Sequence, residues 1–171
     1  MAGKNIFPVP EVGAVSDRPL QILKTFAAEK IPFVIVGGAA IALHGIPRST
    51  LDIDIVIPTE AGTVNRLFST IQATGLSSRD KYIFTLIDKP HLLIGQWMAL
   101  QDKLGMELID IFFEGEKEFK GLLKRAKKIK GIKSNFYIAS LMDLEKMKKI
   151  SARPIDLADI VLIREKRGRK K

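Results

Sequence analysis

The sequence predicts an α+β fold in which one mixed β-sheet is flanked by helices. Short β-branched segments alternate with stretches whose apolar residues recur every three or four positions, which are the periods of strands and helices. Between residues 82 and 113, predicted strands follow one another across short turns, which favours antiparallel neighbours. Neither an interdomain linker nor a repeat interrupts the chain, so residues 17–163 are expected to form a single domain.

The first half of the chain opens with a segment that lacks any hydrophobic period. Residues 1–16 contain two Pro and two Gly and are expected to form an extended arm. Asp17 is a good N-cap for the helix that follows, and Pro32 ends this helix. The expected elements are a helix at 17–31, a strand at 33–36, a short helix at 39–44, a strand at 51–57 and a helix from 64 to about 75.

The second half of the chain contains most of the predicted strands. Ser140 and Asp143 have the spacing of a capping box, and Pro154 suits the first turn of a last helix. Residues 164–171 are strongly basic and are expected to form a disordered tail. The remaining expectations are strands at 82–87, 91–100 and 106–113, a helix at 116–128, a weak strand at 135–138 and a helix at 140–149.

Composition places the chain among globular proteins. Of its 171 residues, 46% are apolar and 27% are charged, which is enough to build a sizeable core. No apolar run is long enough to cross a membrane, and the N-terminus lacks the pattern of a secretory signal. Cysteine is absent, which excludes disulfides, thiolate ligands and a Cys nucleophile. We therefore expect a cytoplasmic protein that does not interact with a membrane.

The net charge of +9 is distributed unevenly along the sequence. Residues 117–171 carry 18 Lys and Arg against six Asp and Glu, whereas residues 1–116 carry 10 against 13. A strongly basic segment of this kind favours a polyanion such as RNA as a partner. A solvated Lys-rich helix face followed by a frayed tail would give the same count, so charge alone leaves both interpretations open.

Paired carboxylates are the sharpest chemical signal in the sequence. Asp52 and Asp54 alternate with apolar residues on a predicted strand, so both carboxylates are expected to project from the same face. Asp110 lies within a second apolar strand. If the two strands are neighbours, the three acids converge into a site for Mg²⁺ or Mn²⁺, which prefer oxygen ligands. For Asp52 and Asp54 alone, an edge strand with solvent-facing acids is an equally good interpretation.

A glycine pair precedes the first two acids. Gly37 and Gly38 follow a predicted strand and precede a predicted helix, where glycine lets the backbone approach a phosphate and the helix N-terminus attracts anions. A tight turn needed for packing would also explain them. The sequence matches neither the dinucleotide-binding pattern G-x-G-x-x-G nor a P-loop.

Together these motifs resemble those of a known superfamily. The glycine pair at 37–38, thirteen intervening residues, Asp52-Ile-Asp54 and the later Asp110 are similar to the signature of the nucleotidyltransferase superfamily of the DNA polymerase β type. Within it, residues 37–54 and the segment 148–159 resemble the AbiEii/AbiGii-type branch. One position departs from that branch, because Ile155 stands where the branch usually carries Lys or Arg.

The resemblance implies a nucleotidyltransferase-like mixed sheet and a role for each matching residue. Asp52, Asp54 and Asp110 would ligate the metal, and Asp110 would also be the base for an acceptor hydroxyl. The residues implied in binding the nucleoside triphosphate are Gly37, Gly38, Arg48, Ser49, Thr50 and Lys148. Either Lys148 or Lys149 could take the place of the missing basic residue at 155, and the sequence leaves both open.

Two classes of function follow from this pattern. The first is an enzyme that transfers a nucleoside monophosphate from a triphosphate to a hydroxyl of RNA, of a protein or of a small molecule. The second is an inactive binding or regulatory module with the same fold, for example a component of a toxin–antitoxin pair, in which a protein partner would matter most. Asp156 and Asp159 are better explained as ion-pair partners of Arg153 and Lys148 than as site residues.

Overall fold

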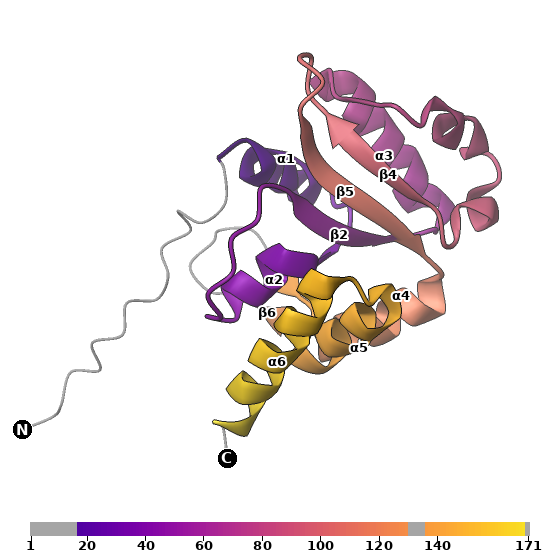
Figure 1. Ribbon diagram of the computed structural model, residues 1–171. Coiled ribbons are helices and arrows are strands. Elements are labelled where there is room, and N and C mark those ends of the chain that lie inside the picture. The colour runs from indigo at the N-terminus through magenta and orange to yellow at the C-terminus, as the bar shows by residue number, and fades with distance from the viewer. Residues whose placement is uncertain (1–16, 130–135, 170–171) are drawn as a thin grey trace, which may run out of the picture.

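The computed structural model describes residues 17–129 and 136–169, and Figure 1 shows their arrangement. Within these residues, seven strands form one mixed sheet in the order β3-β4-β5-β2-β1-β7-β6. The strands are β1 (Val34–Val36), β2 (Ile53–Pro58), β3 (Ser77–Ser78), β4 (Trp97–Gln101), β5 (Glu107–Glu114), β6 (Lys127–Lys128) and β7 (Tyr137–Ile138).

Helices account for most of the remaining described residues. In Figure 1, α1 and α3 lie behind the sheet, while α2, α5 and α6 lie together at its lower end. None of the helices in the described residues is long and apolar enough to cross a membrane. The helices are α1 (Asp17–Ala28), α2 (Gly37–Leu43), α3 (Ala61–Thr74), α4 (Glu116–Arg125), α5 (Leu141–Ser151) and α6 (Pro154–Gly168), with 3₁₀ helices η2 (Lys81–Leu86) and η3 (Pro90–Leu93).

The central strands β2 and β5 run parallel to each other. β1 pairs with β2 in antiparallel orientation, and β4 pairs with β5 in the same way across a short turn, as predicted. On one face of the sheet, the isoleucines of β2 and β5 are fully buried beneath the apolar stripes of α1 and α3. The other face carries the alternate residues of the same strands, among them Asp54 and Asp110.

Two predicted strands are wrong or too long. Residues 82–86 lie in the 3₁₀ helix η2 and residue 87 in the turn after it, while 91–93 end η3 and 94–96 form a turn and loop, so the strand predicted at 91–100 begins only at Trp97. Each 3₁₀ turn buries one residue, Ile83 or Leu93, beneath exposed or half-buried neighbours. The apolar residues that suggested strands therefore belong to short 3₁₀ turns, each of which buries a single side chain in the core.

The predicted disordered tail is also wrong in part. Helix α6 continues to Gly168, and Arg164 and Arg167 both pair with the buried carboxylate of Glu145 on α5. These ion pairs hold the last turns of α6 against α5, which explains why residues 164–168 are helical. Residues 1–16, predicted as an extended arm, and residues 170–171 lie outside the described residues.

The helix predicted at 116–128 is shorter than expected. It ends at Arg125, and Lys127–Lys128 instead form the edge strand β6 against β7. The weak strand predicted at 135–138 is present as β7, and Ser140 caps α5 by accepting a hydrogen bond from the backbone of Asp143, as its spacing predicted. Pro154 stands in the first turn of α6, which was also predicted.

Candidate active site

Two of the predicted acidic residues face each other across the central strands. Asp54 of β2 and Asp110 of β5 are register partners in a parallel ladder, so their side chains leave the same face of the sheet side by side. Asp54 and Asp110 therefore converge, as a shared metal site would require. Parallel pairing places them together although 55 residues separate them in the chain.

The negative charge of the two carboxylates is only partly compensated by nearby cations. Burial raises the pKa of Asp54 to about 6, and the charges of Asp52 and Asp110 act in the same direction. The positive charges of Lys148 and Arg153 oppose this shift without cancelling it. Burial also raises the pKa of Asp110 to about 6, with Asp52 adding to the effect. Carboxylates that repel each other in a half-buried place are a suitable environment for a cation.

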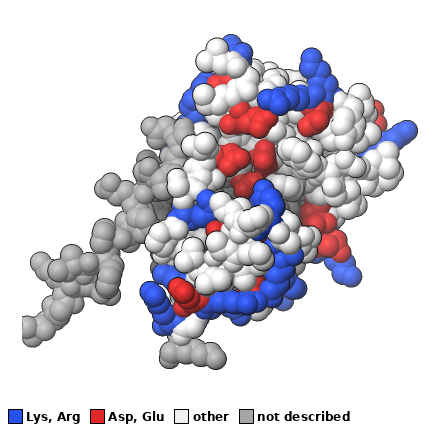
Figure 2. Space-filling model, in the orientation of Figure 1, with Lys and Arg blue, Asp and Glu red and all other residues white. Residues whose placement is uncertain are grey.

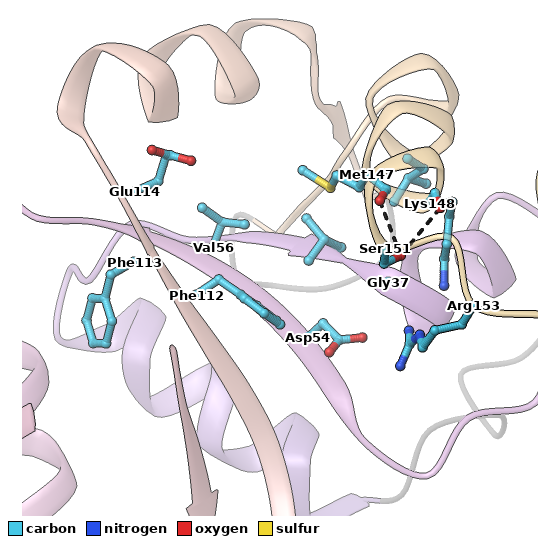
Figure 3. A pocket seen from close by; sticks show the side chains of 12 residues that line it. Gly37, Asp54, Val56, Phe112, Phe113, Glu114, Met147, Lys148, Ser151 and Arg153 are labelled. Carbon is cyan, nitrogen blue, oxygen red and sulfur yellow. Dashed lines mark hydrogen bonds between the residues drawn. The ribbon is translucent and has the colours of Figure 1, made fainter. Parts of the chain in front are cut away.

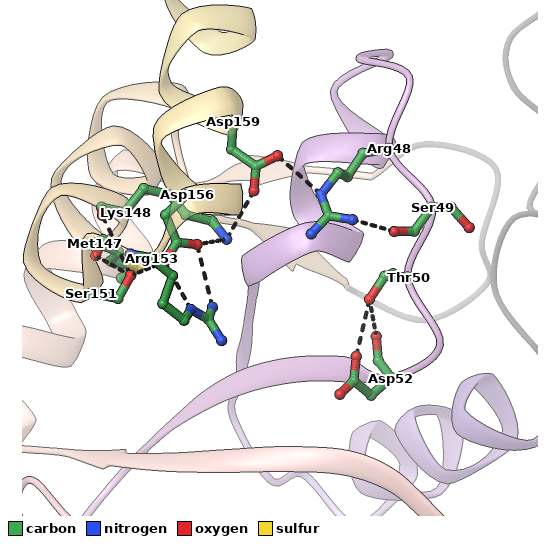
Figure 4. A network of polar contacts seen from close by, with 10 residues as sticks. All are labelled: Arg48, Ser49, Thr50, Asp52, Met147, Lys148, Ser151, Arg153, Asp156 and Asp159. Atoms are coloured by element: carbon green, nitrogen blue, oxygen red, sulfur yellow. Dashed lines mark hydrogen bonds and ion pairs between the residues drawn. The ribbon is translucent and has the colours of Figure 1, made fainter.

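Asp52 approaches this pair from outside the sheet. Strand β2 begins at Ile53, so Asp52 lies in the bend that precedes it, and Leu51 is 94% exposed. The predicted strand start at residue 51 is therefore wrong. Thr50 fixes the bend, because its hydroxyl donates to the Asp52 Oδ1 at 3.0 Å and to its backbone carbonyl at 3.1 Å (Figure 4). Thr50 thus positions a carboxylate.

Gly37 and Gly38 lie so close to Asp54 and Thr50 that there is little room for larger residues at these positions. Gly37 has a φ of +64°, and a Cβ placed there would be 1.8 Å from the Oδ2 atom of Asp54. Any side chain at position 37 would therefore collide with the carboxylate. A Cβ on Gly38 would lie 3.3 Å from the Cβ of Thr50, a tight contact that could relax. The prediction that these glycines cradle phosphates is not tested by this geometry, but it shows that Gly37 makes room for Asp54.

A pocket of about 300 Å³ opens between this face of the sheet and α5 (Figure 3). Gly37 and Asp54 form part of its wall on the sheet side, and Lys148, Ser151 and Arg153 line it from the helical side. The rest of the wall is largely apolar and includes Val56, Phe112, Leu144 and Met147. The pocket therefore joins two acidic residues, Asp54 and Glu114, with two basic residues and an apolar surface.

Lys148 is buried within a network of ion pairs behind the pocket (Figure 4). Its Nζ atom lies 2.7 Å from Asp156 Oδ1 and 3.0 Å from Asp159 Oδ2. The second contact has the distance of an ion pair but not the angles of a hydrogen bond, so Asp159 Oδ2 has no hydrogen-bond donor within the described residues. The pairing of these acids with Lys148 confirms the structural role predicted for them.

Arg153 is a site residue that the sequence analysis treated only as an ion-pair partner. It links α5 to α6, and its guanidinium donates to Asp156 Oδ2 at 2.8 Å while two thirds of the side chain stays exposed at the pocket. The contact with Arg153 contributes most to the lowered pKa of Asp156.

Of the loop residues predicted to bind the triphosphate, Arg48 and Thr50 contact residues around the site, whereas the side chain of Ser49 does not. Arg48 donates from Nε to Asp159 Oδ1 at 3.0 Å, which ties the loop before β2 to α6. Ser49 is exposed and accepts a hydrogen bond from Arg48 only through its backbone carbonyl. Arg48 and Thr50 therefore lie in the network around the site, whereas the Ser49 side chain is not drawn into it.

The donor set fits a hard divalent cation in its chemistry. Asp52, Asp54 and Asp110 offer only carboxylate oxygens, and within the described residues no hydrogen bond or ion pair satisfies Asp54 or Asp110. As they stand, however, no three His, Cys, Asp or Glu side chains of residues 17–129 and 136–169 are close enough together to hold an ion. The acids thus form a region of unbalanced negative charge, and ligation by all three requires their side chains to rearrange.

Comparison with solved structures identifies the fold. No protein family's sequence profile and no curated protein sequence matches this chain. An antigenic nucleotidyltransferase-like protein from Paracoccidioides brasiliensis superposes with a TM-score of 0.52 over 85% of this chain and 72% of its own, at 15% identity. ANT(2")-Ia, solved in complex with adenylyl-2"-tobramycin, gives a TM-score of 0.54 over 91% of this chain and 100% of its own, at 13% identity.

The chain therefore has a nucleotidyltransferase-like fold, a mixed sheet flanked by helices, and this predicted fold class is confirmed. At 13–15% identity the likeness concerns the fold alone. The closer resemblance to the AbiEii/AbiGii-type branch is carried by the sequence motifs and stays a prediction.

Proposed function

We propose that this protein is a metal-dependent nucleotidyltransferase, which moves a nucleoside monophosphate from a nucleoside triphosphate to an acceptor hydroxyl. The observation that carries the proposal is the in-register pair Asp54–Asp110, with Gly37 against Asp54 and a pocket lined by basic residues beside it. Acidic and basic groups in this order suit a reaction in which a polyphosphate is both bound and cleaved.

In this mechanism, Asp52, Asp54 and Asp110 would hold Mg²⁺ or Mn²⁺. The bound metal would offset charge on the phosphate oxygens. Asp110 would accept the proton of the acceptor hydroxyl while the acceptor oxygen bonds to the α-phosphorus. The bond between the α-phosphorus and the bridging oxygen would break in line, so that pyrophosphate leaves with the electron pair.

The triphosphate would enter the pocket between the sheet and α5. Arg153 is exposed there, and Lys148 lies behind it, so both can act on phosphate oxygens. The apolar wall formed by Val56, Phe112 and Met147 would receive the base. Ile155, at the position where the resembling branch carries a basic residue, is 48% exposed on α6, and Arg153 is the cation that would take over its contact.

The nature of the acceptor is open among three classes. Figure 2 shows acidic side chains in the middle of the face and Lys and Arg gathered along its lower part, where Figure 1 places α5 and α6. The basic surface favours RNA, as the charge of residues 117–171 does. The solved complex of ANT(2")-Ia holds adenylyl-2"-tobramycin, which makes a small-molecule acceptor the second candidate. A protein acceptor would suit a toxin–antitoxin role.

Calorimetry tests this proposal directly. ATP, CTP, GTP and UTP would each be titrated into the full chain with Mg²⁺ or Mn²⁺, and into the double variant Asp52→Ala/Asp54→Ala. We expect metal-dependent binding of at least one triphosphate that is lost in the double variant. Asp88→Asn, which changes an exposed acid in the turn before η3, is the matched control and should bind as the wild type does.

An inactive regulatory module is the alternative function. It is favoured by the pairing of both Arg48 and Lys148 with Asp159, which neutralises two of the cations expected to meet a triphosphate. Failure of the wild-type chain to bind any triphosphate with either metal would reject the enzyme and support this alternative.

A further inference from the structure

Helix α6 reverses the usual arrangement of charged and apolar residues over its first half. Asp156 is 0% and Asp159 is 1% exposed, whereas Leu157 is 56% and Val161 is 55% exposed. A helix at the surface of a globular protein ordinarily buries its apolar stripe and exposes its charged residues. Asp156 and Asp159 are the only charged residues between 154 and 162, so the exposed side of this stretch carries no charge.

This reversal follows from the ion pairs that α6 makes with the rest of the domain. Lys148 contacts both acids of the helix, and Arg48 donates to Asp159 at 3.0 Å. These contacts fix which side of α6 is turned inward. Leu157 and Val161 stand one helical turn apart, and both are held outward and remain more than half exposed. An apolar surface that is held outward in this way gains free energy when another molecule covers it.

The exposed apolar residues at the start of α6 form one surface, which we call the apolar patch. At 3.6 residues per turn, they fall on the outer side of the first two turns of the helix. In Figure 2, uncharged side chains form a white area where Figure 1 places α6, with Lys and Arg above and below it. The apolar patch consists of Pro154, Ile155, Leu157, Ala158 and Val161.

The helices α5 and α6 also carry more exposed cations than exposed acids. Lys149, Arg164 and Arg167 all pair with the single carboxylate of Glu145, which leaves an excess of two positive charges. The side chains of these three cations remain about half exposed. Of the five acidic residues on α5 and α6, only Glu165 is exposed. The exposed surface of the two helices therefore combines an apolar patch with a positive border.

We propose that the apolar patch binds an amphipathic helix of a partner protein, whose apolar stripe is flanked by Asp or Glu. Leu157 and Val161 supply an i, i+4 ridge of the kind on which a second helix packs. Arg164 lies three residues beyond Val161 on α6, so it borders the ridge and is placed to pair with a carboxylate of the partner. The proposal does not depend on triphosphate binding, because neither Leu157 nor Val161 lines the pocket.

Other occupants match only part of this surface. Phosphates of RNA would meet the cations but leave the apolar patch uncovered, and α5 and α6 contain no aromatic residue on which a base stacks. A helix that lies in a membrane surface usually carries aromatic residues beside its leucines, and α6 has none. A second copy of this chain would bring two positive borders together. An acidic helix satisfies both the apolar and the charged parts of the surface.

Selection from a peptide library tests the proposal, since it assumes nothing about the sequence of the partner. Phage that display helical peptides with randomised outer positions would be selected for binding to the full chain. We expect the enriched peptides to carry Leu, Ile or Val at positions i, i+4 and i+7, flanked by Asp and Glu. Enrichment of Lys-rich and Arg-rich peptides, or of peptides without such a stripe, would overturn the proposal.

Two variants locate the binding surface. Leu157→Gln/Val161→Gln makes the apolar patch polar with a residue that favours helices, and should weaken binding of the best acidic peptide at least tenfold in anisotropy titrations. Leu104→Gln changes an apolar side chain that is 85% exposed in the β4–β5 turn, and as the matched control it should leave the affinity unchanged. Circular dichroism should show equal helix content in both variants and the wild type, since the substitutions lie at the surface. Equal peptide affinities for the double variant and the wild type would refute the proposal.

Two further measurements distinguish the other occupants. Cosedimentation with vesicles of phosphatidylcholine and phosphatidylserine would detect membrane binding by the full chain, and analytical ultracentrifugation would detect a dimer. We expect neither vesicle binding nor a dimer that depends on the apolar patch. Vesicle binding that is lost in Leu157→Gln/Val161→Gln would assign the apolar patch to a membrane, and a dimer that is lost in this variant would assign it to a second copy. Either result would overturn the proposal.

Discussion

Gly37 and Asp54 are in such close contact that only a residue without a Cβ fits at position 37. The ideal Cβ position is 1.8 Å from Asp54 Oδ2, and the φ of +64° adds strain for any other residue. The backbone turn and the carboxylate therefore depend on each other. The expected consequences can be measured as unfolding free energies.

We expect Gly37→Ala to destabilise the chain by about 2 kcal/mol or more, because the new methyl group displaces Asp54 and the backbone is strained. Gly38→Ala should cost less, since its nearest contact is 3.3 Å from Thr50 Cβ. Urea denaturation gives both values. In Gly37→Ala/Asp54→Ala the carboxylate is gone, so only a tight contact of 3.0 Å between the two Cβ atoms and the backbone strain, together about 1 kcal/mol, should remain. A double variant as unstable as Gly37→Ala would show that the contact with Asp54 is unimportant.

Asp110 should make the metal-free chain less stable as the pH rises. Its pKa is about 6 in the folded chain against 3.8 ordinarily, so the folded state binds more protons between these values. The free energy of unfolding should therefore fall as pH rises from about 4 to about 6. Asp110→Asn should remove this contribution and stabilise the chain by about 1 kcal/mol at pH 7.5 in the presence of EDTA. A variant less stable than wild type at pH 7.5 would contradict the repulsion inferred among the acids.

Glu145 should show the opposite dependence on pH. Hydrogen bonds from Lys149 and Arg164 lower the pKa of Glu145 from 4.5 to about 2. The stability it contributes is therefore complete above about pH 4.5 and is lost as pH falls towards 2. Glu145→Gln should be less stable than wild type at pH 6, and this difference should shrink steadily below pH 4.5 in urea titrations. A difference that does not change down to pH 3 would mean that the charge of Glu145 is irrelevant.

The buried charges around Lys148 should tolerate joint removal better than single removal. Lys148→Met leaves Asp156 and Asp159 buried without their shared cation and should cost about 3 kcal/mol. Lys148→Met/Asp156→Asn/Asp159→Asn should recover much of that loss in thermal denaturation. Calorimetry should nevertheless find no triphosphate binding to the stable triple variant. Full binding there would show that Lys148 serves structure alone.

The sequence was most informative where the signal is local. Residues 33–57 contain the strand, the glycine pair and two of the acids in close succession. Each of these features can be recognised from the types of the residues that form it. The cap at Ser140 and the proline at 154 are equally local and were predicted at the positions observed. Such features depend on a few neighbouring residues, which the sequence displays directly.

Contacts between residues far apart in the sequence could be predicted only on the condition that particular strands are neighbours. That Asp54 and Asp110 are register partners depends on parallel pairing of distant strands, which no local pattern encodes. The 3₁₀ helix at Lys81–Leu86 was mistaken for a strand because its apolar residues pack against the core formed by other segments. Arg153 was missed as a pocket residue because its place depends on how α5 and α6 meet.

The described sheet ends in two very short edges. β3 contributes only Ser77–Ser78 at one edge and β6 only Lys127–Lys128 at the other. Two residues expose too few backbone groups to template another strand, and lysines on an edge repel an incoming chain. We therefore expect this fold to resist fibril growth through those edges. A protein that binds it has to recognise side chains, since strand addition has no adequate place to start.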